Sequence, residues 1–290
     1  MRFLAELVLS GLAIGAVYGI IAMGFAVIYK ATGLVNFAQG ELTMIVAYVA
    51  WTISTTVSGN VVVVAVGSLL AAVLIGLAIE RVVMRPMLGE PVFATVMVTI
   101  ALAVILRSSI NFIWDAYPHA LDLGIGRGIV RAGGVGIRTG QIAVIATLLA
   151  LLAGFWLFFR YSKFGVAMRA VAADDRTALL MGVNTGKVHA AAWAASTAIA
   201  GIAGIFFALS ADLSPAMFQL GLKAFPATIL GGLDAVIGSG LGGILIGVAE
   251  NLAGGYLGSG TKEIAGFVMI IVILMVRPFG LFGQRDIERV

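Results

Sequence analysis

The chain has 290 residues, of which 61% are hydrophobic and 11% are charged, and its mean hydropathy is +1.10. Soluble globular chains average about 25% charged residues, so this composition excludes a soluble domain and predicts an integral membrane protein. The net charge of +4 comes from Lys and Arg scattered over short connections, which excludes a basic nucleic-acid groove. With no cysteine and two isolated histidines, we expect no disulfide, no metal site and no cofactor.

Several apolar runs reach the length of about 20 residues that a helix needs to cross a hydrocarbon core, and the alternating pattern of a membrane barrel is absent. We therefore predict an all-α, polytopic membrane protein that forms a single domain over residues 1–290. The first segment is too long and too poor in basic residues for a signal peptide, so we expect it to be retained. Eight hydrophobic segments are predicted, at residues 4–28, 42–57, 61–83, 92–110, 141–159, 187–209, 223–254 and 263–277.

The first connection is unusually polar. The first segment carries Gly11, Gly15 and Gly19 at four-residue spacing, a pattern that favours close helix packing. The residues Asn36, Gln39 and Glu41 then interrupt the apolar sequence at 36–41. One interpretation is that they approach a translocation pathway, because irregular polar backbone survives in a membrane only inside protein or beside water. The other is an ordinary cytoplasmic turn with a helix beginning near Glu41.

Basic residues indicate the orientation. Three connections rich in Lys and Arg should lie in the cytoplasm. They contain Arg81 and Arg85; Arg160, Lys163, Arg169, Arg176 and Lys187; and Arg277, Arg285 and Arg289. This places the N-terminus and residues 111–140 outside, and it requires residues 223–254 to enter and leave by the same face. The outer loop should form a small ordered lobe, with glycines at 124, 126, 128, 133, 134, 136 and 140.

Two charged residues fall within apolar segments. Arg107 stands about 15 residues into the run that begins near Val92, so we expect it near the outer interface, with its side chain snorkelling to water. Glu250 lies near the end of a glycine-rich segment and should face protein or water, because a charge facing lipid is costly.

The longest polar interval covers residues 161–184. We predict a helix at about 166–181, inside a cytoplasmic loop at about 160–186, with Arg169 and Arg176 on one side and Asp174 and Ala178 on the other. Its small residues would allow a partner to approach closely, and Gly182 is placed to end it. The alternative is an amphipathic helix lying on the bilayer surface. The candidate docking residues are Arg169, Ala170, Asp174, Ala178, Gly182 and Asn184.

Residues 223–254 are rich in glycine, with pairs at 231–232 and 242–243. This favours broken or re-entrant helices, and the alternative is that Gly242, Gly243 and Gly247 only allow close packing. Phe218, Phe225 and Pro226 could shape a passage for an apolar side chain, while helix N–H groups receive a carboxylate. The candidate pathway residues are Asn36, Gln39, Glu41, Phe225, Gly231, Gly232 and Glu250.

Five ordered motifs carry a family resemblance over nearly the whole chain. They are GLVNFAQGELTMIVAY, AIERVVMRP, RAVAADDRTALLMGVN, KAF with LGGLDAVIGSGLGG, and RPFGLFG. Together they resemble the permease subunits of branched-chain amino-acid ABC importers of the LivH type. The sequence departs from the family pattern at Gln39, Ala173, Asp234 and Ile237, none of which disturbs the docking pattern.

The resemblance implies a division of labour in a bacterial inner membrane. This chain would form half of the translocation pathway, paired with a homologous permease or with itself. Two cytoplasmic ATP-binding subunits and a periplasmic solute-binding protein would complete the importer, with residues 166–181 as the coupling helix. The sequence has no G-x-x-x-x-G-K-[ST] phosphate loop, so we expect no enzyme activity here and ATP hydrolysis on the partner subunits.

Two alternatives stay open at this point. A permease for urea or short amides would share the same motifs. A self-sufficient channel or secondary transporter would have the same broken helices and membrane carboxylates but would not need a docking helix.

Overall fold

The computed structural model describes residues 2–125, 128–132, 135–258 and 260–283. The loop residues Gly126, Gly133 and Gly134 and the tail residues Arg285 and Arg289, which entered the predictions above, lie outside these ranges.

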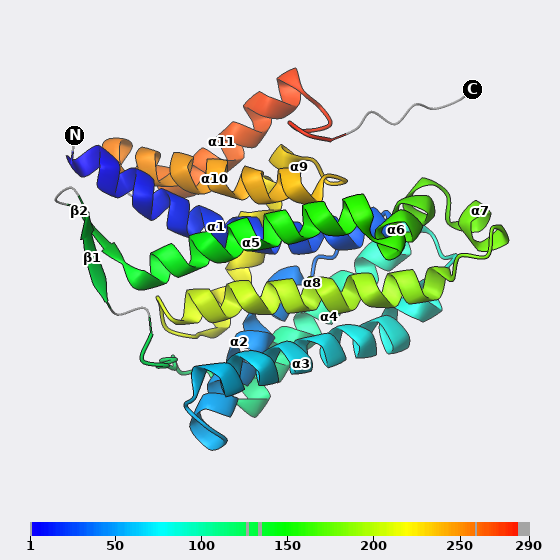
Figure 1. Cartoon of the computed structure of the whole chain (residues 1–290), viewed down its shortest axis with the longest axis horizontal. Helices are drawn as coiled ribbons and strands as arrows, with labels where there is room; N and C mark the ends of the chain where they lie inside the picture. Colours follow the sequence, from blue (N-terminus) through cyan, green and yellow to red (C-terminus); the bar gives the residue numbers. More distant parts are fainter. Residues whose placement is uncertain (1, 126–127, 133–134, 259, 284–290) are drawn as a thin grey trace.

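Long helices run lengthwise through the molecule, most of them antiparallel to the next (Figure 1). Six helical stretches of the described chain are long and apolar enough to cross a membrane. They contain α1 (Arg2–Thr32), α3 (Val61–Ile79), α4 (Val92–Ile113), α5 (Thr139–Tyr161), α8 (Thr185–Ala208) and α10 (Val236–Leu257). Helix α2 (Gln39–Thr56) lies between α1 and α3, α9 (Gln219–Gly231) lies between α8 and α10, and α11 (Thr261–Val276) follows α10. The α3 stretch continues through a π-helical turn, Glu80–Met84, and a 3-10 turn, Arg85–Met87.

Helix α1 is the central element, and it contacts α10 more extensively than any other helix. The glycines explain how the two backbones meet. A Cβ atom on Gly243 would lie 2.1 Å from the amide nitrogen of Gly19, and one on Gly247 would lie 2.3 Å from the Cα of Gly15. The predicted close packing of the first helix is therefore present, with the small residues of α10 as its counterpart.

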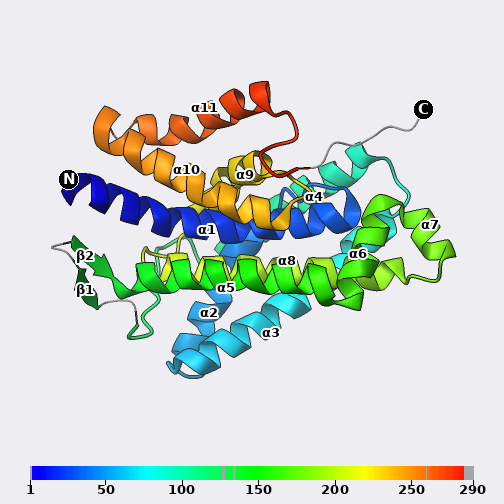
Figure 2. The same cartoon turned by 45° about the horizontal axis from the view of Figure 1, so that its top comes forward.

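The two ends of the bundle differ (Figures 1 and 2). One end carries the N-terminus and an antiparallel hairpin of β1 (Ile129–Ala132) and β2 (Val135–Arg138), in which Ile129 pairs with Arg138. Two backbone hydrogen bonds of 2.9 and 2.8 Å join His119 to Leu213 at this end, and the His119 ring stacks on Trp51. The hairpin was not predicted, because its strands of four residues are too short to show a period.

Helices α9 and α10 form the predicted broken pair. Gly232 ends α9 with a φ of +105°, a conformation that favours glycine. The C-terminal segment seals the break, because the amide of Leu281 donates to the carbonyl of Leu230 at 2.9 Å and that of Phe282 to Gly231 at 3.1 Å. Helix α10 then runs toward the end of the bundle that carries the N-terminus (Figure 2).

The polar interval lies at the opposite end, and its predicted single helix at 166–181 is wrong. The structure contains two helices, α6 (Lys163–Ala173) and α7 (Asp175–Leu180), which are separated by Asp174 in an extended conformation. The physical reason is the side chain of Asp174, which accepts hydrogen bonds from the amides of Arg176 and Thr177 and so begins a new helix.

Candidate functional site

Helix α2 begins inside the bundle rather than at its end. Its first residue, Gln39, lies against Gly24 of α1, and its side-chain oxygen accepts hydrogen bonds of 3.1 Å from the Asn36 amide and the Ser196 hydroxyl. The side-chain oxygen of Asn36 accepts from the amide of Ala38 at 3.0 Å. The polar side chains of Asn36 and Gln39 are thus buried and hydrogen-bonded inside the protein, as polar groups at membrane depth must be.

The first turn of α2 carries a buried charge. Glu41 is 3% exposed, and its carboxylate accepts a hydrogen bond from the guanidinium of Arg107 on α4. The same guanidinium lies 3.3 Å from the ring centroid of Phe218, in a cation–π contact. The two charges and the ring therefore form one cluster that joins three segments far apart in the sequence.

We expected Arg107 to snorkel to water at the outer interface, but in the structure its guanidinium pairs with Glu41. Its position along α4 suggested that the Arg107 side chain lies near water. Position along a helix, however, does not say which neighbouring side chains the residue faces. The carboxylate of Glu41 supplies a partner inside the protein, and pairing there replaces the need for water.

A cavity of about 190 Å³ adjoins this cluster, between α1, α2, α4, α9 and the short turn Pro215–Phe218. The ring of Phe225 lies 5.7 Å from that of Phe25 and 5.9 Å from that of Phe37, so three aromatic rings form one wall. Glu41 and Arg107 supply the charges of an otherwise mainly apolar lining.

Two glycines let α2 and α9 meet beside the cavity. A Cβ atom on Gly40 would lie 2.2 Å from the carbonyl oxygen of Phe218, and one on Gly221 would lie 2.5 Å from the Cα of Gly40. The start of α2 therefore touches α9 backbone to backbone. Larger residues at either position would push Glu41 away from the aromatic wall.

The cavity has an apolar rim on the surface of the bundle. Leu222 and Val104 are each 58% exposed, and Ile100 and Phe37 are each 39% exposed. A mixed site of two charges and several rings thus lies just below an exposed apolar surface on α4 and α9.

The structure brings only some of the predicted pathway residues together. Glu41 and Phe225 line the cavity, while Asn36 and Gln39 lie behind it in the network that holds the start of α2. Gly231 and Gly232 lie at the sealed end of α9.

Glu250 lies in a different part of the bundle. It is buried on α10, it hydrogen-bonds Tyr18 of α1, and its Oε1 would be 3.2 Å from a Cβ atom on Gly266 of α11. It therefore faces protein, as expected from its charge, but it does not line the cavity beside Glu41.

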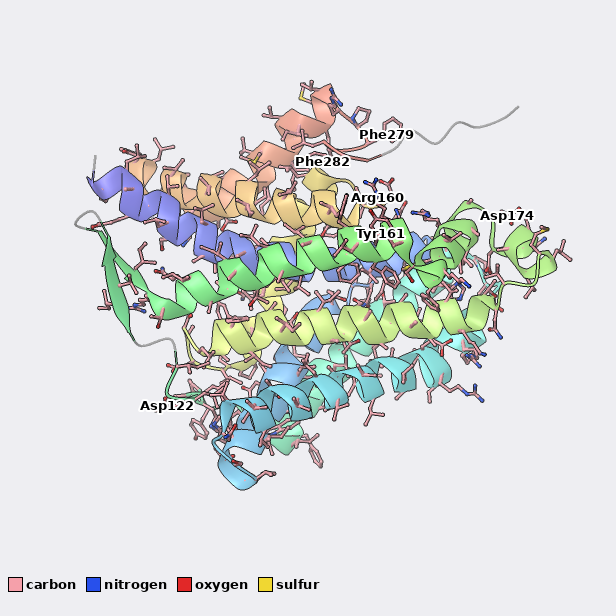
Figure 3. All side chains as sticks on the ribbon, viewed as in Figure 1. Asp122, Arg160, Tyr161, Asp174, Phe279 and Phe282 are labelled. Atoms are coloured by element: carbon pink, nitrogen blue, oxygen red, sulfur yellow. The ribbon has the colours of Figure 1, made fainter. Side chains whose placement is uncertain are left out.

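The predicted docking residues lie around α6 and α7, and each has a contact within the chain. Asp174 and Asn184 cap α7 and α8, and Gly182 closes α7 at a φ of +84°. Arg169 donates to the carbonyl of Phe159 at the end of α5. Ala178 is buried and Ala170 is half-buried. Figure 3 shows Asp174 at the end of the bundle away from Asp122, beyond Arg160 and Tyr161.

Sequence reasoning missed three consecutive exposed apolar residues at this end. Leu179, Leu180 and Met181 are 60%, 86% and 80% exposed at the end of α7. The signal was present, because three large apolar residues stand between a capping Asp174 and a terminating Gly182 in a polar interval. They form what we call the α7 tip, residues 179–181.

Helix α7 also touches the interior of the bundle. The Asp175 carboxylate lies 4.0 Å from Nε2 of His189, which is 5% exposed on α8. Both residues line a cavity of about 290 Å³ between α8, the π-helical turn and α6. No group of three His, Asp or Glu side chains within the described ranges could hold a metal ion.

The amino-acid sequence is similar to those of known membrane transport proteins. Residues 7–277 match the family described as "Branched-chain amino acid transport system / permease component". The chain is 32% identical to the high-affinity branched-chain amino acid transport system permease protein LivH of Escherichia coli K12, with 97% of this chain and 96% of that protein covered. It is 30% identical to the corresponding permease protein BraD of Pseudomonas aeruginosa, with 100% and 98% covered.

Among solved structures, the fold is similar to a chain of PsaBC from Streptococcus pneumoniae, solved in complex with Fab. The TM-score is 0.50 at 11% identity, with 96% of this chain and 93% of that chain covered, so this likeness concerns the fold alone. The match to the family extends over nearly the whole chain, and the relatives at 30% identity or more are covered almost from end to end. The chain therefore belongs to the family of permease components of branched-chain amino acid transport systems.

Proposed function

We propose that this chain is the membrane permease subunit of an ATP-driven importer that moves branched-chain or related amino acids across a bacterial inner membrane. The observation that carries this proposal is the end-to-end similarity to LivH and BraD, which are named as high-affinity branched-chain amino acid permeases. A multi-pass bundle with a charged cavity at depth, between helices that could cross a membrane, suits this task.

A second permease, either a twin or a homologue, would cover the rim of the cavity. The argument is energetic, because a charged side chain that faces lipid near the bilayer centre costs about 3 kcal/mol. Arg107 is 39% exposed beside the rim residues Val104 and Leu222. A partner permease on α4 and α9 would remove this exposure and would turn the cavity into part of a shared passage.

Two ATP-binding subunits would bind at the opposite end from the hairpin, on the α7 tip. Exposed large apolar residues on a short capped helix suit insertion into a groove of a soluble partner. Asp174 and Gly182 fix the two ends of α7, so a push on the tip would reach His189 on α8 through Asp175. ATP would be hydrolysed on these partners, and a periplasmic solute-binding protein would deliver the substrate at the hairpin end.

Reconstitution tests the proposal. The chain would be co-purified with its ATP-binding, permease and solute-binding partners and placed in proteoliposomes. We expect uptake of radiolabelled L-leucine, L-isoleucine or L-valine that requires ATP and every component. ATP-dependent uptake of urea or acetamide without amino-acid uptake would assign the chain to the amide carriers of the family. Uptake by this chain alone, without ATP, would contradict the proposal.

A further inference from the structure

We propose that Glu41 and Arg107 form a clamp for the two charged groups of a free amino acid, with the side chain of the substrate on the wall of Phe25, Phe37 and Phe225. The inference rests on the proposed function and goes beyond it, because it gives the permease a substrate site of its own. The substrate ammonium would bind the Glu41 carboxylate, and the substrate carboxylate would bind the Arg107 guanidinium.

The two protein charges have the correct chemistry and separation for this role. They are in direct contact, and the two charged groups of an α-amino acid are attached to a single carbon atom, so one ligand can reach both. A guanidinium binds a carboxylate through two parallel N–H donors. One nitrogen of the Arg107 fork donates to Glu41, and the buried Nε–H of Arg107 has no acceptor within the described part of the chain. A substrate carboxylate would use the unpaired donor.

The cavity is electrically neutral when the pair is closed, and it stays neutral when a zwitterion enters. A ligand with a single charge would instead leave one net charge in a poorly solvated site, which is costly. The site should therefore favour an amino acid over an amine or a carboxylic acid with the same hydrocarbon part. An apolar cavity without the pair would show the opposite preference and would favour uncharged ligands.

The surroundings hold the clamp in place. Phe218 stacks on the Arg107 guanidinium at 3.3 Å and so acts as a positioning residue for it. Gly40 and Gly221 allow the start of α2 to lie against α9, which brings Glu41 to the same cavity as Phe225. The ring contacts of Phe225 with Phe25 and Phe37 form an apolar wall for a branched aliphatic side chain.

Direct binding tests the clamp without the solute-binding protein. The permease pair with its ATP-binding subunits would be placed in nanodiscs, and binding of radiolabelled L-leucine would be competed with 3-methylbutylamine, 4-methylpentanoate and 4-methylpentanamide. We expect L-leucine to compete at least tenfold better than each of the three analogues. Arg107→Gln should weaken L-leucine binding by at least tenfold and should let 3-methylbutylamine compete more effectively than it does in the wild type. Glu41→Gln should weaken L-leucine binding similarly and should let 4-methylpentanoate compete more effectively.

The double variant Glu41→Gln with Arg107→Gln separates binding from folding, because it leaves no unpaired buried charge. It should remain a monodisperse complex, lose L-leucine binding by at least tenfold and now prefer the uncharged amide. The matched control is Glu80→Gln, which removes a similarly buried carboxylate that pairs with Arg85 at 3.2 Å outside this cavity, and it should bind L-leucine like the wild type.

Two results would overturn the clamp. One is wild-type binding of L-leucine by the double variant, and the other is the absence of L-leucine binding to a wild-type complex that still imports it when the solute-binding protein is added. In both cases ATP-dependent import by the complete complex would remain, so the proposed function would stand without the clamp.

Discussion

At the residue scale, several charged and polar side chains near α6 and α7 shape the chain before they meet any partner. Asp174 is the clearest case, because its carboxylate accepts hydrogen bonds from the amide of Arg176 at 2.9 Å and from the hydroxyl of Thr177 at 2.5 Å. The Thr177 side chain is the main reason that the pKa of Asp174 lies below its ordinary value of 3.8, with the Thr177 amide next. Asp174 thus ends α6 through its backbone amide, which donates to Ala170, and begins α7 through its carboxylate.

The cap at Asp174 gives a first prediction. Asp174→Ala should speed hydrogen exchange of the Arg176 and Thr177 amides several-fold and fray α7, while Asp174→Asn should preserve most of the protection because asparagine is also a good cap. Exchange measured by mass spectrometry on the complex in nanodiscs checks this. Equal protection in the alanine variant and the wild type would show that the cap does not hold α7.

The pH dependence of this cap follows from the direction of the pKa shift. Because the pKa of Asp174 is lower in the folded state than in the unfolded chain, the cap stabilises α7 fully at neutral pH. Its contribution is lost only as the pH falls through the folded-state pKa. The protection of Thr177, corrected for intrinsic exchange, should therefore stay constant between pH 8 and pH 5.

At the element scale, the bundle depends on backbone contact between α1 and α10. The glycines of both helices are needed there, because a Cβ atom on Gly243 would meet the Gly19 amide, which cannot move as a flexible side chain can. Gly243 and Gly247 therefore allow close helix packing, while Gly231 and Gly232 lie at a break between two helices. The two interpretations of this glycine-rich segment, packing and a break, hold for different residues.

Gly243→Leu should destabilise the fold by about 3 kcal/mol, at the upper end of the range for overpacking. The measurement is the thermal midpoint of the purified protein in detergent, together with its yield as a monodisperse peak. The control is Gly154→Leu on α5, which adds the same side chain where no atom lies within 4 Å of the new Cβ. Similar losses in the two variants would show that helix propensity, not backbone contact, is responsible.

At the scale of the whole molecule, the two candidate regions lie apart. Helix α7, which carries the tip, lies at one end of the bundle (Figure 1). The Glu41–Arg107 cavity lies between α2, α4 and α9. In the proposed importer, closure of the ATP-binding subunits would move α7, and α8 would carry that motion inward. Ser196 of α8 hydrogen-bonds Gln39 at the start of α2, which is two residues from Glu41.

The last prediction concerns this connection. Leu180→Asp should reduce ATP-dependent uptake in proteoliposomes by more than tenfold and weaken co-purification of the ATP-binding subunits, because a charge replaces an 86% exposed apolar side chain of the α7 tip. Leu180→Met, which stays apolar, should keep both. L-Leucine binding to the Leu180→Asp permease should be unchanged, because Leu180 does not line the cavity. Normal uptake by the aspartate variant would exclude the tip as the coupling contact.

The amino-acid sequence determined the membrane class, the placement of the apolar helices and the break at Gly231–Gly232. These follow from local properties, namely hydropathy over about 20 residues and the conformational freedom of glycine. It also identified Gly182 as the end of a helix, because a cap depends on residues only a few positions away.

The tertiary structure decided which residues meet. Glu41 and Arg107 are 66 positions apart, and their pairing depends on α2 beginning inside the bundle beside α4. The same is true of Phe225, which reaches this cavity, and of Glu250, which faces α11 instead. A sequence shows the cost of each buried charge, but the partner that offsets this cost is a neighbour in space, and only the packed helices determine which neighbour that is.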